Sequence, residues 1–364
     1  MTTGATSGPA CGKGSHVAGR TAIGLDIGTS GVRAAELSFG KDGITLDKFG
    51  QVAVPDGAVR DGEVIDAEAV AGAIRQLWAA THFSHKKVVL GVANQRVIVR
   101  QVELPQMPEA ELKKALPFQV QDFLPMPVEQ AVLDFHPLES VQVNGNNLVR
   151  GLLVAASRDT VLANVQCAQR AGLTPTMVDL TSFAVLRSVG KRSDLDVETE
   201  AIVDVGARVT NIVVHSGGVP RFVRILLMGG QDITDTVAER LGVPLGEAEG
   251  LKQQLGVQGG SAELASASRA VESTAQGFVD EVRGSLDYYA ASNPSHPVER
   301  LVLSGGGSQL RGLAERVGQA TRLPVVAGNP MSSLHIGRTG LDDAQLAIVQ
   351  PLAAVPVGLA LGAA

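Results

Sequence analysis

The feature that most constrains this fold is a glycine-containing β-hairpin near the N-terminus, with one acid just before its turn. Residues 23–33 read IGLDIGTSGVR, and the apolar side chains before the turn alternate as in a buried strand. After GTSG, an apolar run resumes with Val32, Ala34, Ala35 and Leu37. Because no helix-forming run follows the glycines, the pattern predicts strand–turn–strand and not the strand–turn–helix of a P-loop.

The chemistry of this turn suits a phosphate. Gly28 and Gly31 let the backbone approach a ligand closely, and turn N–H groups and hydroxyls can point at phosphate oxygens. Asp26 stands where a carboxylate can hold a hydrated Mg²⁺, and Arg33 can reach back to a phosphate. The alternative is an ordinary turn in which the aspartate bonds its own backbone.

The hairpin pattern recurs in the second half of the chain. Residues 201–214 read AIVDVGARVTNIVV, with Asp204 and Gly206 at the turn, about 180 residues after the first acid. Near the end, residues 300–313 read RLVLSGGGSQLRGL, in which a strand runs into three glycines and a helix predicted over 309–318. Two such hairpins predict a duplicated architecture with a phosphate-binding turn in each half.

Composition narrows the class of protein. The 364 residues allow about two domains of roughly 150 residues. A net charge of −6 gives no reason to expect nucleic-acid binding. Cys11 and Cys167 have neither metal-ligand spacing nor a disulfide framework, which fits a reducing compartment. The first 20 residues lack the apolar core of a secretory signal and are rich in Gly, Ser and Thr, so we expect a disordered leader.

Strand-rich hairpins alternate with helical patterns in both halves, which predicts two α/β lobes. We expect the first lobe over 21–190, a charged linker over 191–200 and the second lobe over 200–364. A small α+β insert is predicted over about 100–156, with Pro117 kinking or ending its helix.

The apolar C-terminal stretch 346–364 allows two interpretations, a membrane tail or a buried helix after Pro356. Pro351 and Pro356 interrupt the stretch and no basic residues flank its end, so the pattern favours the buried helix.

Taken together, the two Asp-x-Gly hairpins and the late SGGGSxLxGL motif resemble the phosphate-1, phosphate-2 and adenosine motifs of the superfamily of actin, heat-shock-protein and sugar-kinase ATPases. Within it, three stretches resemble the PilM family of type IV pilus assembly over about residues 21–364. They are LPQMPEAELKKALPFQVQDFLPMPVEQAVLDFHPL, AASRDTVLANVQCAQRAGLTPTMVDLTSFAVLR and RILLMGGQDITDTVAERLGVPLGEAEGLK. The resemblance implies an α/β actin-like ATPase fold, with duplicated ribonuclease H-like lobes and a small inserted subdomain.

The resemblance also implies ATP and Mg²⁺ as ligands. Asp26 and Asp204 would hold the metal. The residues that would contact the phosphates or the adenosine, or support the second phosphate loop, are Gly28, Thr29, Ser30, Gly31, Arg33, Gly206, Thr210, Gly305, Gly306 and Gly307. Many family members carry Lys where Arg33 stands, and Arg is less compact.

Three further residues keep two interpretations each. Glu249 and Lys252 lie on one helix face and resemble a pair that reaches ribose and base, although a surface ion pair explains the spacing equally well. Asp179 is the candidate catalytic residue, because the resemblance implies that a water is positioned from the start of the helix that follows it; the alternative is a helix N-cap. Because positioning dominates phosphoryl transfer, the resemblance supports binding better than turnover and implies slow ATP hydrolysis at most.

The function implied by the resemblance is a cytoplasmic nucleotide-bound scaffold. It would bind the N-terminal cytoplasmic tail of a PilN-like inner-membrane protein in a groove beside the insert, contact other pilus assembly proteins, and meet the membrane only through that partner. One alternative is an FtsA-like division or cytoskeletal ATPase, although that family should end in a basic membrane-binding helix and no Lys or Arg follows Arg338. A small-molecule kinase is the other, but no second acid with a sugar-binding constellation is evident.

Overall fold

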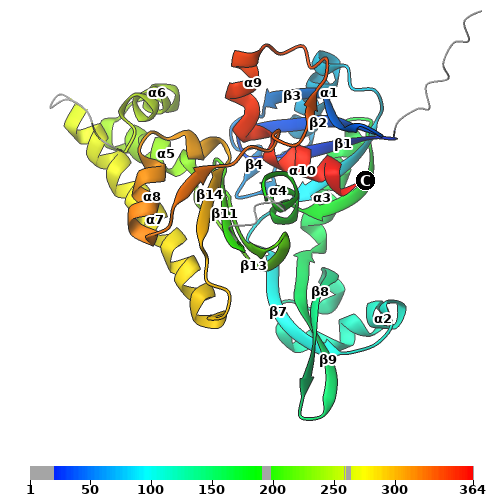
Figure 1. Ribbon diagram of the computed structural model, residues 1–364. Helices are drawn as coiled ribbons and strands as arrows, with labels where there is room; N and C mark the ends of the chain where they lie inside the picture. Colours follow the sequence, from blue (N-terminus) through cyan, green and yellow to red (C-terminus); the bar gives the residue numbers. More distant parts are fainter. Residues whose placement is uncertain (1–19, 191–197, 258, 260–263, 364) are drawn as a thin grey trace, which may run out of the picture.

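The computed structural model describes residues 20–190, 198–257, 259 and 264–363 (Figure 1). The predicted leader lies outside these residues, apart from Arg20, which begins the first strand. Most of the predicted linker 191–200 also lies outside them.

Two large sheets form the body of the molecule. The first has the order β10-β6-β1-β2-β3-β16, with β1 antiparallel to β2 and parallel to β6. Its strands are β1 Arg20–Ile27, β2 Gly31–Gly40, β3 Gly43–Ala53, β6 Lys87–Val92, β10 Thr174–Leu180 and β16 His335–Ile336. The predicted first hairpin is therefore confirmed, because every residue of β1 pairs with β2.

The second sheet repeats this arrangement in the order β13-β12-β11-β14-β15. Its first strand is again antiparallel to the next one along the chain and parallel to a later one. Its strands are β11 Thr199–Val205, β12 Thr210–Ser216, β13 Val219–Leu226, β14 Arg300–Ser304 and β15 Val325–Ala327. The duplicated α/β architecture predicted from the two hairpins is thus present.

Helices cover one face of the first sheet because alternate strand residues are apolar on that side. Leu25, Ala34 and Leu90 are fully buried there, beneath α1 Ala67–Thr81 and α3 Arg158–Arg170. Asp66 caps α1, and its Oδ1 accepts hydrogen bonds from two backbone N–H groups at 3.0 Å.

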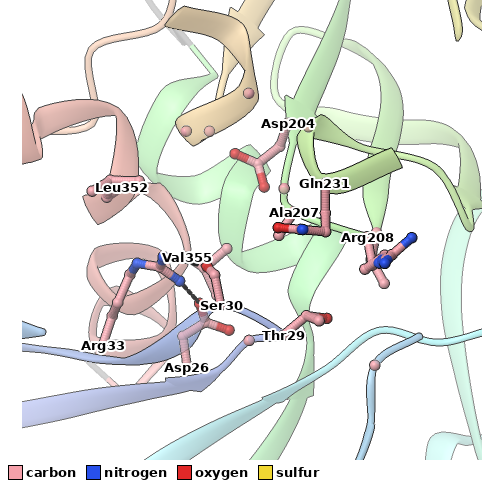
Figure 2. A pocket seen from close by; sticks show the side chains of 18 of the residues that line it. Asp26, Thr29, Ser30, Arg33, Asp204, Ala207, Arg208, Gln231, Leu352 and Val355 are labelled. Atoms are coloured by element: carbon pink, nitrogen blue, oxygen red, sulfur yellow. Dashed lines mark hydrogen bonds and ion pairs between the residues drawn. The ribbon is translucent and has the colours of Figure 1, made fainter. Parts of the chain in front are cut away.

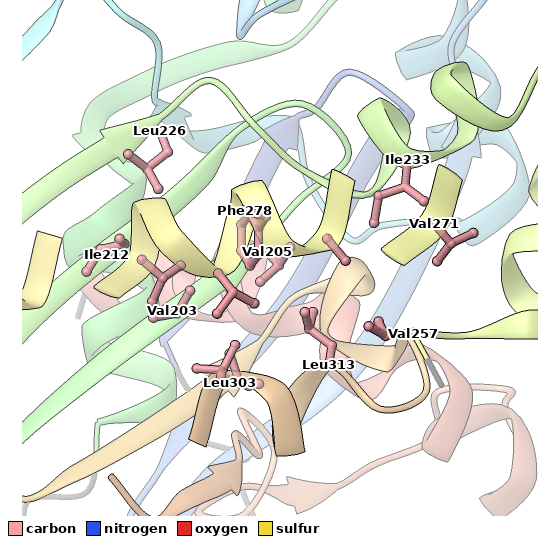
Figure 3. Packing of buried hydrophobic residues seen from close by; sticks show 14 of the residues in the cluster. Val203, Val205, Ile212, Leu226, Ile233, Val257, Val271, Phe278, Leu303 and Leu313 are labelled. Atoms are coloured by element: carbon pink, nitrogen blue, oxygen red, sulfur yellow. The ribbon is translucent and has the colours of Figure 1, made fainter. Parts of the chain in front are cut away.

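The second sheet is covered in the same way by α5 Gly230–Leu241, α6 Leu245–Leu255, α7 Ala265–Ser292 and α8 Leu313–Thr321. Figure 3 shows α7 lying across buried side chains of the sheet, among them Val203 and Val205. The opposite face of the sheet packs elsewhere, because Ile202 and Val213 join a core with α4 Thr181–Val189. Helix α4 therefore lies between the two sheets.

The C-terminal part of the chain returns to the first sheet. Strand β16 pairs with β3, and α10 Ala354–Gly362 packs on β1, β2 and α4, preceded by α9 Asp343–Val349. This arrangement differs from the sequence-based division, which placed all of 200–364 in the second lobe. The apolar stretch has no polar face to leave in water, so it is buried against the first sheet and α4.

One described helical stretch, Asp343–Gly362, is long and apolar enough to cross a membrane. Half of it is buried within the fold, and every residue from Ala354 to Ala360 is buried. This matches the predicted buried helix, although α10 starts two residues before Pro356 and includes it.

A third, three-stranded sheet of order β7-β9-β8 extends away from the body (Figure 1). It contains β7 Val97–Pro105, β8 Ala131–Val143 and β9 Asn146–Ser157, and α2 Glu109–Gln119 packs over one face. Helix α2 continues two residues past Pro117, so of the two predicted effects, a kink or an end, the proline does not end the helix at its own position; it falls within the last turn.

The remaining elements are short. They are the strands β4 Val59–Arg60 and β5 Glu63–Val64, and the 3-10 helices η1 Gln121–Phe123, η2 Val128–Gln130, η4 Gly306–Gln309 and η5 Gln350–Ala353. The helix predicted over 309–318 is not continuous. Gly312 has a left-handed φ of +84°, which separates η4 from α8 at Leu313.

Candidate functional site

The turns of the two hairpins line one cleft with a volume of about 580 Å³ between the lobes (Figure 2). The first turn is closed by hydrogen bonds between Gly28 and Gly31, at 3.0 Å from Gly28 N to Gly31 O and 3.4 Å in return. Thr29 and Ser30 lie at its tip and line the cleft, whereas Gly31 closes the turn without lining it. The sequence pattern therefore correctly identified the turn and its exposed hydroxyls.

The second turn is joined to the start of α5. Gly206 N donates to Val209 O at 3.0 Å, and a Cβ added at Gly206 would lie 2.5 Å from that same carbonyl oxygen, so only glycine fits. Gly206 O in turn accepts from Gly230 N at 3.0 Å. Thr210 is fully buried and its hydroxyl donates to Met228 O at 2.7 Å, which supports the loop from behind without lining the cleft.

Asp26 and Asp204 enter the cleft from opposite lobes (Figure 2). Burial raises the pKa of the Asp26 carboxyl, and the Arg33 guanidinium partly opposes this. Burial also raises the pKa of Asp204, to about 7; the charge of Asp26 adds to the rise, while Ser304 and Arg33 oppose it. Two carboxylates that repel each other across one cleft could together hold a cation.

The oxygen donors of the two acids are of the type that a hard cation such as Mg²⁺ takes. The Oδ1 of Asp204 is buried and accepts no hydrogen bond from any described residue. An unpartnered carboxylate oxygen is costly unless a cation or water reaches it, and Mg²⁺ prefers hard oxygen ligands. Within the described part of the chain, no group of three or more His, Cys, Asp or Glu gathers to hold a metal alone. Water or phosphate oxygens would therefore have to complete the coordination.

Arg33 turns back along its own hairpin. Its Nη1 lies 3.8 Å from Asp26 Oδ2, and its Nη2 donates to Ser30 Oγ at 3.0 Å. The guanidinium also lines the cleft, so one cation both compensates the first carboxylate and faces the ligand space.

The three glycines after β14 form another wall. Gly305 has a φ of +81°, and a Cβ there would lie 2.4 Å from Val205 O, so this turn packs directly on β11. Gly306 faces Leu352, whose Cδ2 would lie 2.8 Å from an added Cβ, and Gly307 packs on Val205. The three glycines therefore have two roles: they allow this turn to pack closely on β11, and they leave backbone without side chains at the wall of the cleft.

Glu249 and Lys252 also line the cleft. Lys252 Nζ lies 2.6 Å from Glu249 Oε2, and it also donates to Gly230 O at 3.1 Å and Thr234 Oγ1 at 3.0 Å. Burial works against ionisation of Glu249, but hydrogen bonds to Lys252, Thr234 and Gln253 leave its pKa below the usual value. The pair is therefore a partly buried network at the cleft, not an isolated surface ion pair.

The structure does not bring Asp179 into the cleft. Its Oδ2 pairs with Arg187, whose Nε donates to Gly358 O at 3.0 Å, and its Oδ1 accepts from Leu180 N. Asp179 therefore joins β10 and α4 to α10. It is not the N-cap of α4, because that position is Leu180. Thr181, the next residue, lines the cleft instead.

Several lining residues had no signal in the sequence. On the second-lobe side, Arg208 lies within the second turn and Gln231 at the start of α5. Leu352 and Val355 approach from the C-terminal segment (Figure 2). The C-terminal residues reach the cleft only because that segment folds back onto the first sheet, which no local pattern indicates.

The duplicated sheets, the buried lobe interface and the two-turn cleft define the class, an actin-like ATPase fold. The ethanolamine utilization protein EutJ from Carboxydothermus hydrogenoformans has the same fold at 16% identity, with a TM-score of 0.54 over 94% of this chain and 89% of that chain. A solved structure of the PilM-PilN type IV pilus biogenesis complex is more similar, with a TM-score of 0.83 and 28% identity over 94% of this chain and 98% of that one.

The sequence profile of the family described as type IV pilus assembly protein PilM matches residues 24–364. The chain therefore belongs to the PilM family. It is also 24% identical over 349 residues to the cell division protein FtsA of Neisseria meningitidis serogroup B, covering 84% of this chain and 83% of that protein. FtsA of Bacillus subtilis is 24% identical over 260 residues, covering 64% of this chain and 58% of its own length.

Proposed function

We propose that this protein is an actin-like scaffold of type IV pilus assembly that binds ATP with Mg²⁺ in the cleft between its lobes. The observation that carries the proposal is the convergence of two carboxylates in one cleft, the partly buried Asp26 and the buried Asp204, each followed by a glycine turn. Bringing two carboxylates this close costs free energy, and a cation with bound phosphates would offset the cost.

Different residues of the cleft would contact different parts of the bound ATP and Mg²⁺. Asp26 and Asp204 would hold Mg²⁺, with the hydroxyls and N–H groups of the first turn on the phosphates and Arg33 beside them. Glu249 and Lys252 would face the ribose and base, and the Gly305–Gly307 turn would support the adenosine. When bound, Mg²⁺ would neutralise phosphate charge. The ion pair that holds Asp179 outside the cleft supports slow hydrolysis at most.

Calorimetry with ATP and Mg²⁺ tests the binding proposal. We expect saturable binding by the wild-type protein, and weakening by roughly tenfold or more in Asp26→Ala, because a charged ligand of the metal is lost. Asp287→Ala, which removes an exposed aspartate on α7, is the matched control and should bind as the wild type does. Absence of binding by the wild type would overturn the nucleotide assignment and leave the family membership intact.

The proposed partner is the cytoplasmic N-terminal tail of a PilN-like inner-membrane protein. The structural likeness to the PilM-PilN complex supports this, and a protein bound to such a tail would lie on the cytoplasmic side and reach the membrane through it. The sheet β7-β9-β8 offers a surface of its own for an extended peptide, either along an edge strand or beside it. A pull-down with a synthetic tail peptide against a scrambled peptide tests this. Equal capture of both, with and without nucleotide, would contradict it.

A second candidate is assembly into filaments, which the similarity to FtsA over most of the chain favours. Sedimentation with ATP and Mg²⁺ distinguishes the two functions, because a scaffold for a peptide tail remains in the supernatant at concentrations at which a filament-forming protein pellets. Contacts with other pilus assembly proteins would be searched for by the same pull-down after the tail has been bound.

A further inference from the structure

One cleft residue has a hydrogen-bonding capacity that the proposed nucleotide site does not use. Gln231 lies in the first turn of α5, and its carboxamide points into the cleft between Asp204 and Thr29 (Figure 2). Its backbone N–H donates to Ala207 O at 2.8 Å, which ties the residue to the second phosphate turn. The side chain is therefore held on the second lobe and faces the first turn across the ligand space.

The orientation of this amide is fixed by chemistry. Gln231 Nε2 donates to Asp235 Oδ1 at 3.0 Å, and a carboxylate can only accept, so the nitrogen must be on that side. Asp235 is itself held by Arg208, which also pairs with Asp232 at 2.8 Å. The amide nitrogen is therefore used by Asp235, and the carbonyl oxygen Oε1 is the atom that remains available. No described residue donates a hydrogen bond to it.

A carbonyl oxygen without a donor can bind only a group that donates a hydrogen bond. Phosphate oxygens accept hydrogen bonds and do not donate them, so they gain nothing from Oε1. A water molecule donates two protons and matches it. The same Gln-to-Asp pair, four residues apart on a helix, occurs at Gln276 and Asp280 on α7, but there the glutamine oxygen accepts from Arg316 at 3.3 Å and lies outside the cleft.

We propose that Gln231 is a positioning residue that holds the water attacking the terminal phosphate, an inference that rests on the proposed ATP site. In this step the water oxygen bonds to the terminal phosphorus while the bond from that phosphorus to the bridging oxygen breaks. The bridging oxygen keeps the electron pair and leaves with ADP, and the proton released by the water passes to a phosphate oxygen or to solvent. Gln231 accepts one hydrogen bond and is unchanged. Positioning of this kind contributes to phosphoryl transfer without a strong base.

The test compares Gln231→Ala and the near-isosteric Gln231→Met with the wild type and with Gln276→Ala as matched control. Three quantities are measured with Mg²⁺ present: the Kd of ATP, the single-turnover rate of hydrolysis, and the Kd of ADP–aluminium fluoride, which mimics the transition state with its water. Both Gln231 variants should keep the Kd of ATP within about twofold, since the amide contacts water and not phosphate. Their hydrolysis rate and their affinity for ADP–aluminium fluoride should fall roughly tenfold or more.

The outcomes separate the two proposals. If the wild type fails to bind ATP, the proposed function is wrong and this inference falls with it. If ATP binds but wild-type turnover stays at the no-protein background, or the Gln231 variants match the wild type, the nucleotide site stands and the role of Gln231 is overturned. A parallel loss of ATP affinity in the Gln231 variants would show a merely structural role.

Discussion

The two glycine turns of the cleft are built on matching strand pairs, but the residue opposite the acid differs in charge. In the first sheet Asp26 lies opposite Arg33, whereas in the second sheet Asp204 lies opposite Asn211. The backbone register and the glycine that follows each acid are equivalent, so the duplication preserved geometry while it changed charge. One carboxylate has a cation beside it and the other has a neutral amide.

Because of this difference, the two acids of the cleft have different electrostatic surroundings. Burial raises the pKa of both carboxyls. Arg33 lies within ion-pair distance of Asp26 and only weakly opposes the rise at Asp204, which carries the further repulsion of Asp26. Asn211, buried opposite Asp204, accepts a hydrogen bond from Ser182 at 2.9 Å and adds no charge. The second turn is therefore the one that depends on an added cation, and the first is partly compensated by the chain itself.

The largest expected effect comes from removing the uncompensated acid. Asp204→Ala should weaken Mg²⁺-dependent ATP binding by roughly a hundredfold or more, since the proposed metal ligand is lost and no described cation lies within ion-pair distance to take its place. Asp26→Ala should lose less, because Arg33 is then free to contact the phosphates. Calorimetry on both variants measures the difference. Equal losses would contradict the asymmetry between the turns.

A second prediction concerns stability in the absence of ligand. The pKa of Asp204 is about 7 in the folded chain, above its ordinary value, so the folded state binds this proton more tightly than the unfolded state. The contribution is fully present below the unfolded pKa near 4 and is lost as pH rises through 7, by roughly 2–4 kcal/mol. Urea unfolding from pH 4.5 to 8 should show this decline in the wild type.

Asp204→Asn isolates that contribution, because an amide does not titrate in this range. The free energy of unfolding of the variant should vary less over the same interval, and the two curves should separate most above pH 7. Curves that stay parallel would show that Asp204 is not the group responsible. Carboxylates with lowered pKa, such as Glu200 and Glu249, change stability in the opposite direction and below about pH 4.5, so they do not mask the result.

Converting the first turn into the type of the second gives a third, smaller effect. Arg33→Asn leaves Asp26 opposite an amide and should reduce ATP affinity by roughly tenfold, through loss of one charge at the phosphates. The variant should also need a higher Mg²⁺ concentration for half-maximal binding, because no cation among the described residues then lies within ion-pair distance of either acid. Arg75→Asn, which breaks an exposed ion pair with Glu68 on α1, is the matched control. Unchanged affinity in Arg33→Asn would assign the guanidinium a role in the hairpin only.

Local sequence pattern was sufficient for the parts of the site that are local. The apolar alternation, the acid and the glycine turn are all contained in single hairpins, so both turns and the wall at Gly305–Gly307 were identified where the structure has them. The position of Asp179 could not be predicted in this way. Its ion pair with Arg187 joins β10, α4 and α10, a tertiary arrangement that no spacing in the sequence encodes.

The same limit explains the division of the chain. Residues of α10 read as an apolar helix, but the pattern does not say which sheet they cover, and the answer depends on how β16 pairs with β3. Gln231 was passed over for a related reason: a single glutamine at a helix start has no periodic or motif signal. Only the folded structure identifies Gln231 as a candidate, because its amide nitrogen donates to Asp235 while its side chain lines the cleft.

The smallest effect tests the backbone of the two turns. A Cβ at Gly206 would lie 2.5 Å from the Val209 carbonyl oxygen, whereas at Gly28 the nearest atoms, an Arg33 nitrogen and the Gly31 carbonyl oxygen, are both 3.2 Å away. Gly206→Ala should therefore lower the free energy of unfolding by about 1–3 kcal/mol, and Gly28→Ala by less than about 1 kcal/mol, because the Arg33 side chain can move aside.

Urea unfolding of the two alanine variants measures this difference, and calorimetry adds its functional consequence. Gly28→Ala crowds Arg33 at the cleft, so it should weaken ATP binding more than it weakens the fold. Gly206→Ala should do the reverse, since Gly206 O also accepts from Gly230 N and a shift there disturbs the start of α5. The expectation is contradicted if both variants lose stability and ATP affinity in the same proportion. The two turns would then have equivalent backbones, and the charge at position 33 would be the only difference between them.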